Sequence, residues 1–171
     1  EPMERRIRFT GPVDGMTDEG LASFRRLCAP HRPYLLITAR RARALGLDGV
    51  GPTGLAIGDL HDAGAIFSLA ADPQVTRHLD TVPAGETAPA AIVLAKLARL
   101  LPALLVGEGG AAGAVACDPP LMIVAAAAVA QFRRGSIESL GVVAEATIPL
   151  HGASAARFVI FRDGLGGTPV A

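Results

Sequence analysis

The sequence predicts an α/β protein: a mixed sheet with packed helices, followed by a C-terminal β-hairpin. Short apolar runs typical of strands alternate with segments of helical periodicity, as an α/β layer architecture requires. Half of the 171 residues are hydrophobic but only 4% are aromatic, so small aliphatic side chains must form the core. Near the C-terminus, two strand-like runs, Leu140–Ile148 and Phe158–Phe161, flank a turn region and predict the hairpin.

A short strand, Ile7–Thr10, precedes the first predicted helix, which begins after Thr17. Either Thr17 or Asp18 is the expected N-cap, and acidic residues follow in the first turn, where the helix dipole favours them. Apolar residues then recur at helical spacing from Leu21 to Cys28 and predict one buried face.

The next pair is a strand followed directly by a helix. The continuous apolar run Tyr34–Ile37 predicts a strand that is buried on both faces. Thr38 is expected to cap a helix that extends to Leu45 and is basic on its outer face, and Gly46 ends it.

The middle of the chain is less regular. We expect short strands at Leu55–Ile57 and Ala65–Leu69, on either side of a turn at 59–62. Residues 71–87 are polar, with two prolines, and predict an ordered loop or a short helix.

The strongest helix signal is Ala90–Leu101, which is followed by a second central strand, Leu104–Val106. This helix is expected to pack across the sheet and to bury Leu94, Leu97, Ala98 and Leu101. Residues 121–130 are apolar throughout and allow either a strand leading into an Ala-rich helix or a helix alone.

The composition excludes several classes of protein. The sixteen basic and sixteen acidic residues cancel, which argues against a nucleic-acid partner. The two cysteines, Cys28 and Cys117, are too few for a disulfide framework and fit a reducing compartment, so we expect a cytoplasmic protein. Lys96 and Arg99 interrupt the apolar run 88–106, which predicts a buried helix rather than a membrane span.

The motifs assign no catalytic and no metal-binding residue. The Gly-rich stretch 46–54 lacks the Lys-Ser/Thr of a phosphate loop, and the turn 59–62 lacks further metal ligands. The remaining candidate is an anion site at Thr38, Arg40 and Arg41, because free N–H groups at a helix start favour anions. A solvated basic helix face is the alternative.

Two segments resemble 3,4-dihydroxy-2-butanone-4-phosphate synthase, a riboflavin-pathway enzyme with a YrdC/RibB-type fold. Leu35–Leu47 is similar to that family's strand followed by L-T-x-x-R-x-x-x-L-G-L. Ala90–Glu108 resembles its G-H-T-E-A-A-V-D-L-A-R-L-A-G-L, strand and Glu. The resemblance implies that residues 1–138 adopt a YrdC/RibB-like fold.

The departures from that family concern its active site. In the synthase, an acidic loop and the His of G-H-T-E-A bind magnesium and act on ribulose 5-phosphate. Here the segment Glu4–Arg8 is basic, and the His, Glu and Asp of the second motif fall on Thr87, Pro89 and Val93. Only Glu108 remains in register, so the resemblance implies a degenerate domain that keeps the fold and has lost the synthase site.

The C-terminal segment resembles the opening hairpin of GTP cyclohydrolase II, which reads V-x-x-x-A-E-A-x-[LV]-P-T and then G-x-F-x-x-x-x-F-R-D. Leu140–Leu150 and Phe158–Asp163 carry this match, which implies that residues 139–171 are the N-terminal fragment of a cyclohydrolase domain. That family's zinc-binding cysteines, and the zinc and magnesium themselves, are then expected in a missing remainder. We therefore expect this chain to be a fragment.

Together the resemblances imply the N-terminal part of a bacterial GTP cyclohydrolase II-like protein, an enzyme that opens the imidazole ring of GTP and releases formate. This chain itself is expected to be non-catalytic. The alternative is a structural or regulatory assembly module of the same fold. The expected partners are the missing cyclohydrolase domain and a second copy of the chain, because an apolar hairpin strand exposes both faces and an edge. No membrane partner is expected.

Overall fold

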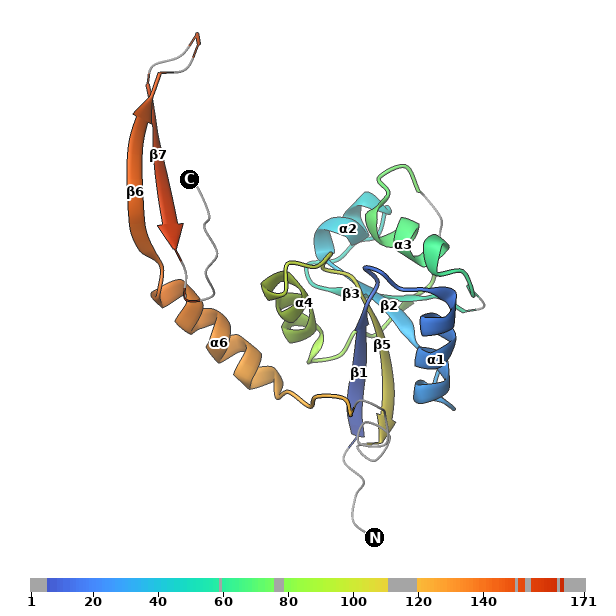
Figure 1. The fold of residues 1–171 in the computed structure, drawn as a ribbon. Helices are drawn as coiled ribbons and strands as arrows, with labels where there is room; N and C mark the ends of the chain where they lie inside the picture. The colour runs from blue at the N-terminus through green and yellow to red at the C-terminus, as the bar shows by residue number, and fades with distance from the viewer. Residues whose placement is uncertain are drawn as a thin grey trace. The chain divides into compact units, whose positions relative to one another are not determined.

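The computed structural model describes residues 6–58, 60–75, 79–110, 120–149, 151–152, 155–162 and 164. The chain divides into two compact units, 1–126 and 127–171. In chain order, the elements shown in Figure 1 are β1 (Arg6–Pro12), α1 (Asp18–Cys28), β2 (Tyr34–Ile37), α2 (Ala39–Ala44), β3 (Thr53–Ala56), α3 (Ala63–Ala71), β4 (Thr81–Val82), α4 (Ala88–Leu97), β5 (Leu104–Gly110), α6 (Ala126–Glu138), β6 (Gly141–Ile148) and β7 (Ala156–Arg162).

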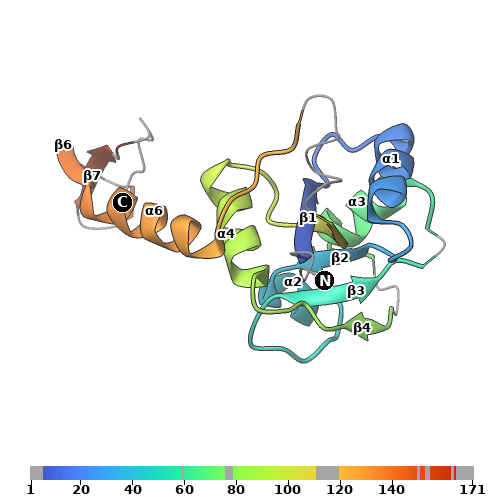
Figure 2. The ribbon, with the colours of Figure 1, turned by 90° about the horizontal axis from the view of Figure 1, so that it is seen from below.

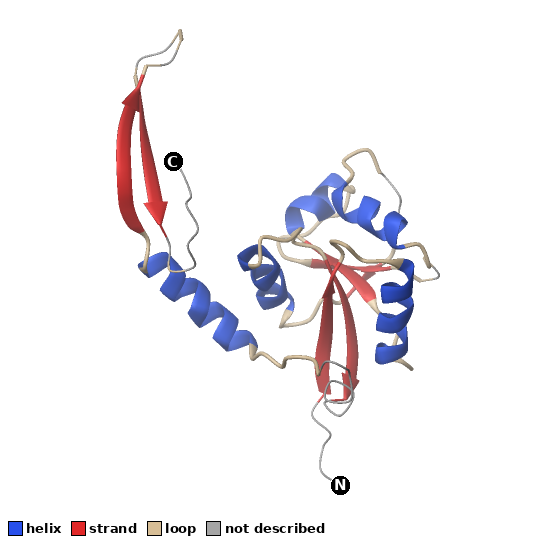
Figure 3. Ribbon diagram, in the orientation of Figure 1, coloured by secondary structure: helices blue, strands red, loops and turns tan. Residues whose placement is uncertain are grey.

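The first unit is built on a five-stranded sheet with the strand order β1-β5-β2-β3-β4. The α/β class is therefore confirmed. The prediction of a mixed sheet is wrong, because every pair of neighbouring strands in this sheet is antiparallel. Figure 3 shows these strands in red among the helices of the same unit.

Helices cover both faces of this sheet, as Figures 1 and 2 show. One core joins Leu35 and Leu105 of the sheet to α1, α2 and α3. A second core joins Leu36, Leu104 and Val106 to α4. Successive residues of β2 and β5 thus enter opposite cores, which confirms the prediction that Tyr34–Ile37 is a strand buried on both faces.

The predicted helix caps are confirmed at the start of α1 and α2. The Thr17 hydroxyl accepts a hydrogen bond from the Gly20 amide at 3.1 Å, and the Thr38 hydroxyl accepts one from the Arg41 amide at 3.2 Å. Each hydroxyl satisfies an amide that has no partner within its own helix. The sequence therefore predicts correctly where these two helices begin.

The predicted strand Ala65–Leu69 is wrong, because these residues belong to α3. The Asp62 carboxylate accepts hydrogen bonds from the amides of Gly64 and Ala65, and Asp18 accepts one from the Ala63 amide at 2.7 Å. These caps start a helix, and its buried residues Ala63, Ile66, Leu69 and Ala70 follow helical spacing.

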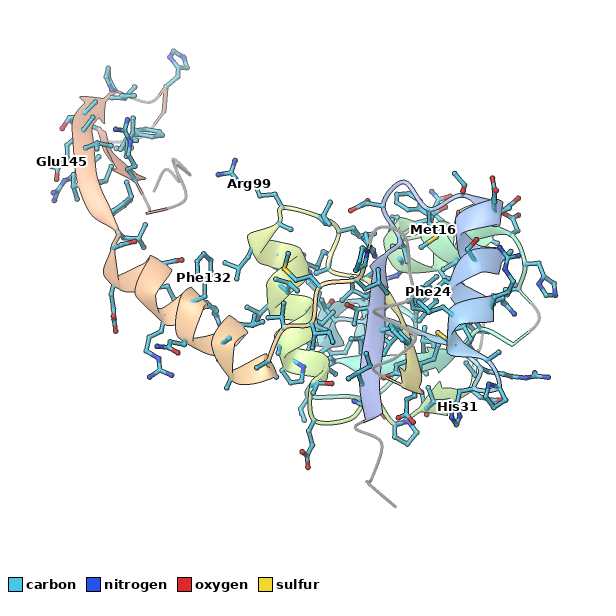
Figure 4. All side chains as sticks on the ribbon, turned by 60° about the horizontal axis from the view of Figure 1, so that its bottom comes forward. Met16, Phe24, His31, Arg99, Phe132 and Glu145 are labelled. Carbon is cyan, nitrogen blue, oxygen red and sulfur yellow. The ribbon has the colours of Figure 1, made fainter. Side chains whose placement is uncertain are left out.

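The predicted buried face of the fourth helix is also wrong. The side chains that α4 buries are Ala88, Ile92 and Ala95, whereas Leu94 is 42% exposed. The helix ends at Leu97, before the predicted end at Leu101. Arg99 then takes a left-handed backbone conformation with φ 58°, and in Figure 4 its side chain points away from the sheet.

The apolar run 88–106 is therefore divided between α4, a turn and β5. Within the described part of the chain, no helix combines the length and the hydropathy that crossing a bilayer requires.

The second unit contains the predicted hairpin, in which β6 and β7 pair antiparallel with an irregularity between Val142 and Ala144. Every side chain of β6 is exposed. Arg157 donates to Glu145 across the hairpin at 2.8 Å. Of the two alternatives for 121–130, a helix without a preceding strand is correct, and it begins at Ala126. The assignment of 1–138 and 139–171 to two families stays a prediction.

Gly107 of β5 lies against Cys28 of α1, so a side chain at this position should be destabilising. A Cβ added at Gly107 would lie 2.1 Å from the Cys28 sulfur. We expect Gly107→Ala to lower the free energy of unfolding by about 1–3 kcal/mol, measured by urea denaturation. Gly51→Ala is the control, because a Cβ there meets no atom within 4 Å. Equal stability of both variants would contradict this packing.

Candidate functional site

A polar cluster lies on the α4 face of the sheet, where β1 and β5 meet the segment that leads into α4. Arg8 and Glu108 are directly opposite each other in the β1–β5 ladder. The Arg8 Nη2 lies 3.6 Å from a Glu108 carboxylate oxygen. The Arg8 Nη1 donates to the Ala84 carbonyl at 3.0 Å and to the Thr87 hydroxyl at 3.1 Å. One guanidinium therefore faces oxygens from two distant parts of the chain, the segment before α4 and strand β5.

Tyr34 of β2 completes this cluster. Its hydroxyl donates to the same Ala84 carbonyl at 2.9 Å. Burial raises the pKa of Tyr34, the nearby Arg8 lowers it and Glu108 raises it, and the net shift is upward. The phenol consequently keeps its proton at neutral pH and remains a hydrogen-bond donor.

The backbone at Gly85 lies directly against the Arg8 guanidinium. A Cβ added at Gly85 would be 1.9 Å from the Arg8 Nη1, and the residue has a φ of +75°. Both the contact and the backbone conformation favour glycine at this position. The loop before α4 is therefore shaped around the arginine side chain.

The structure brings together two positions that the synthase resemblance singled out, Thr87 and Glu108. Thr87 stands at the start of α4, but its side chain makes no cap hydrogen bond to that helix and accepts from Arg8 instead. Pro89 is exposed on α4 and Val93 is half-buried, and neither side chain has an oxygen or a nitrogen. Sequence reasoning found the basic character of the Arg8 segment but missed its pairing and missed Tyr34.

These residues do not fit the magnesium ion that the synthase resemblance implies for that family. Magnesium prefers several oxygen ligands that include carboxylates. Here the cluster has a single carboxylate, Glu108, and a guanidinium already faces it. Among the residues that the structure describes, no three His, Cys, Asp or Glu side chains are grouped to hold a metal ion.

The predicted anion-site residues Thr38, Arg40 and Arg41 all line one cavity of about 220 Å³. The rest of its lining is apolar and comes from the end of β2, from α2, from the end of α3 and from the segment 101–103. Two of the three residues have structural partners. Thr38 caps α2, and Arg41 donates to the carbonyls of Leu69 and Asp72 at 2.8 and 2.6 Å. Arg40 is exposed. The anion site stays a prediction.

The thiol of Cys28 is not poised for chemistry. Cys28 is fully buried, and burial raises the pKa of its thiol to about 11. A thiol with such a pKa is protonated at neutral pH and is a poor nucleophile. Cys117 and Asp59 lie outside the described residues.

Arg41 and Arg40 are neighbours with different partners, so they form a matched pair for substitution. Because Arg41 binds carbonyls at the end of α3, Arg41→Ala should lower the free energy of unfolding by about 1–2 kcal/mol. Arg40→Ala should leave it within about 0.5 kcal/mol, as is usual for an exposed position. Thermal denaturation measures both.

The same variants check the predicted anion site. If the cavity binds an anion, inorganic phosphate should raise the thermal midpoint of the unmodified chain above its value in chloride at equal ionic strength. Arg40→Ala should then lose that gain. Equal midpoints in both salts would rule the site out.

Comparison with known proteins supports one of the two resemblances at a coarse level. No family model matches the sequence. The chain is 36% identical over 150 residues to the GTP cyclohydrolase-2 of Azospirillum brasilense. The match covers 79% of this chain and 38% of that protein, so the chain spans less than half the length of this relative. The similarity supports a GTP cyclohydrolase II-like family for the chain.

Proposed function

We propose that this chain is the N-terminal part of a GTP cyclohydrolase II-like protein of riboflavin biosynthesis. In this proposal, residues 1–138 are a degenerate synthase-like domain and residues 139–171 begin the cyclohydrolase domain. The observation that carries the proposal is the 36% identity to a GTP cyclohydrolase-2 across most of the chain. The hairpin of β6 and β7 supports it, because it lies where the opening hairpin of that domain is expected.

The chain itself is proposed to be non-catalytic. The support comes from the polar cluster, in which Thr87 replaces a histidine and Arg8 faces the one retained acid, Glu108. Zinc and magnesium are proposed to act only in the cyclohydrolase domain beyond residue 171. The low cysteine content supports a location in the cytoplasm.

The proposed lack of turnover is tested with the purified chain. Incubation with GTP, magnesium and zinc should release no formate above a control without protein. Ribulose 5-phosphate should likewise be recovered unchanged, because the cluster has a single carboxylate and no histidine. The Azospirillum brasilense GTP cyclohydrolase-2 is the reference enzyme for the GTP reaction. Formate release that scales with the concentration of the chain would refute the proposal.

The exposed hairpin favours a second candidate function, a structural or regulatory assembly module. Val142 and Val143 of β6 are 53% and 49% exposed, and the half-buried Phe158 and Val159 of β7 pair regularly with β6 and so point to opposite faces. Both faces of the hairpin therefore present apolar side chains. The coding sequence downstream of position 171 separates the two candidates: a cysteine triad of the zinc-binding type supports the enzyme, and its absence supports the module.

Self-association through the hairpin is proposed for either candidate. In sedimentation velocity at about 10 µM, we expect the chain to be a dimer. The double variant Val142→Glu/Val143→Glu should be a monomer, because two charges in the exposed apolar strand oppose strand association. Leu94→Glu is the control: this leucine is 42% exposed on α4 of the other unit, and its variant should remain a dimer. A monomeric unmodified chain would contradict the proposal.

A further inference from the structure

We infer that Arg8 acts as an internal cation which fills an oxygen-lined site on the α4 face and leaves no room for a metal ion at these oxygens. The inference concerns residues 6–110 and does not depend on the proposed cyclohydrolase function. Formate release in the GTP assay would leave it unaffected.

The partners of Arg8 have the chemistry of a cation site. Its guanidinium contacts the Ala84 carbonyl at 3.0 Å, the Thr87 hydroxyl at 3.1 Å and the Glu108 carboxylate at 3.6 Å. All three are oxygen acceptors: two belong to the segment before α4 and one belongs to β5. A hard metal cation binds the same kinds of oxygen. The guanidinium therefore satisfies a set of oxygens that would otherwise attract a cation from solution.

The fold holds the Arg8 side chain in this position. Its β-carbon is fixed by the pairing of Arg8 with Glu108 in the β1–β5 ladder. On the other side, the backbone at Gly85 lies against the guanidinium so closely that a Cβ there would overlap it. The arginine is thus held between the sheet and the loop before α4.

The charge balance also excludes a second cation. Arg8 carries the positive charge that faces Glu108, so a divalent ion at these oxygens would lie within a few ångströms of a guanidinium. Like charges at such distances repel, and the repulsion is stronger in a partly buried site than in water. The Arg8 and Glu108 side chains are only 29% and 37% exposed. A metal ion would have to displace the arginine.

The experiment replaces Arg8 and supplies the missing cation from solution. Arg8→Ala should lower the thermal midpoint by about 3–6 °C. Guanidinium chloride at about 10 mM, far below denaturing concentrations, should restore at least half of that loss relative to sodium chloride at equal ionic strength. The unmodified chain and Arg40→Ala, which removes an exposed arginine, should gain nothing from guanidinium. Circular dichroism shows whether each variant is folded.

Manganese is the probe for the metal, because its paramagnetic resonance signal reports binding without any activity assay. The unmodified chain should show no saturable manganese binding up to about 1 mM. Saturable binding that Glu108→Gln abolishes would overturn the inference. It would also be overturned if Arg8→Ala were as stable as the unmodified chain and insensitive to guanidinium. If Arg8→Ala does not fold, Arg8→Lys replaces it, with a smaller loss of midpoint expected because one ammonium cannot reach all three oxygens.

Discussion

Strand β5 is the constraint on which the first unit depends. It is hydrogen-bonded to β1 on one edge and to β2 on the other. Its side chains enter both cores, with Leu105 on the side of α1 to α3 and Leu104 and Val106 on the side of α4. The strand thus joins the two cores, and among the described residues β2 is the other strand with side chains in both. Where the cores end, Gly107 lets Cys28 approach and Glu108 begins the polar cluster.

Local sequence signals predicted correctly those elements whose residue types and flanking residues indicate the same structure. Tyr34–Ile37, the caps at Thr17 and Thr38, and the hairpin are examples. The helix α3 was missed because a short apolar run does not distinguish a strand from a helix, and the decisive caps include Asp18 from a distant segment. The buried face of α4 was missed because a helix rich in alanine is apolar on several sides. The contacts that choose its face belong to the sheet.

The candidate site depends even more on contacts between distant segments, which local sequence patterns do not predict. The residues Thr87 and Glu108 could be singled out from a motif, but the contact between Arg8 and Ala84 joins positions 76 residues apart. Only the register of β1 against β5 places Arg8 opposite Glu108. No local pattern encodes that register. One signal was available: charged Arg8 alternates with apolar Ile7 and Phe9. This alternation indicates that the Arg8 side chain points to the opposite face of the strand from theirs.

Arginine has a recurrent structural role in this domain, which contains a single lysine. Arg8, Arg25 and Arg41 each donate to backbone carbonyls of a distant segment. Arg25 joins α1 to the carbonyls of Gly58 and Leu60, and Arg41 joins α2 to the end of α3. The planar guanidinium suits this role because its several N–H groups reach more than one acceptor at once. Two loops and one helix end are fixed in this way, where a core of small aliphatic residues has few large side chains to hold them.

The direct pairing of Arg8 with Glu108 also limits how such a sequence can change over time. An acidic residue at position 8 would face Glu108 across the ladder, and like charges at such a pair are destabilising. A histidine at position 87 would place an imidazole ring beside the guanidinium that now binds Thr87. Neither substitution alone builds a metal site, and each disturbs the contacts that exist. While Arg8 is present, metal chemistry at this position would therefore require several simultaneous changes.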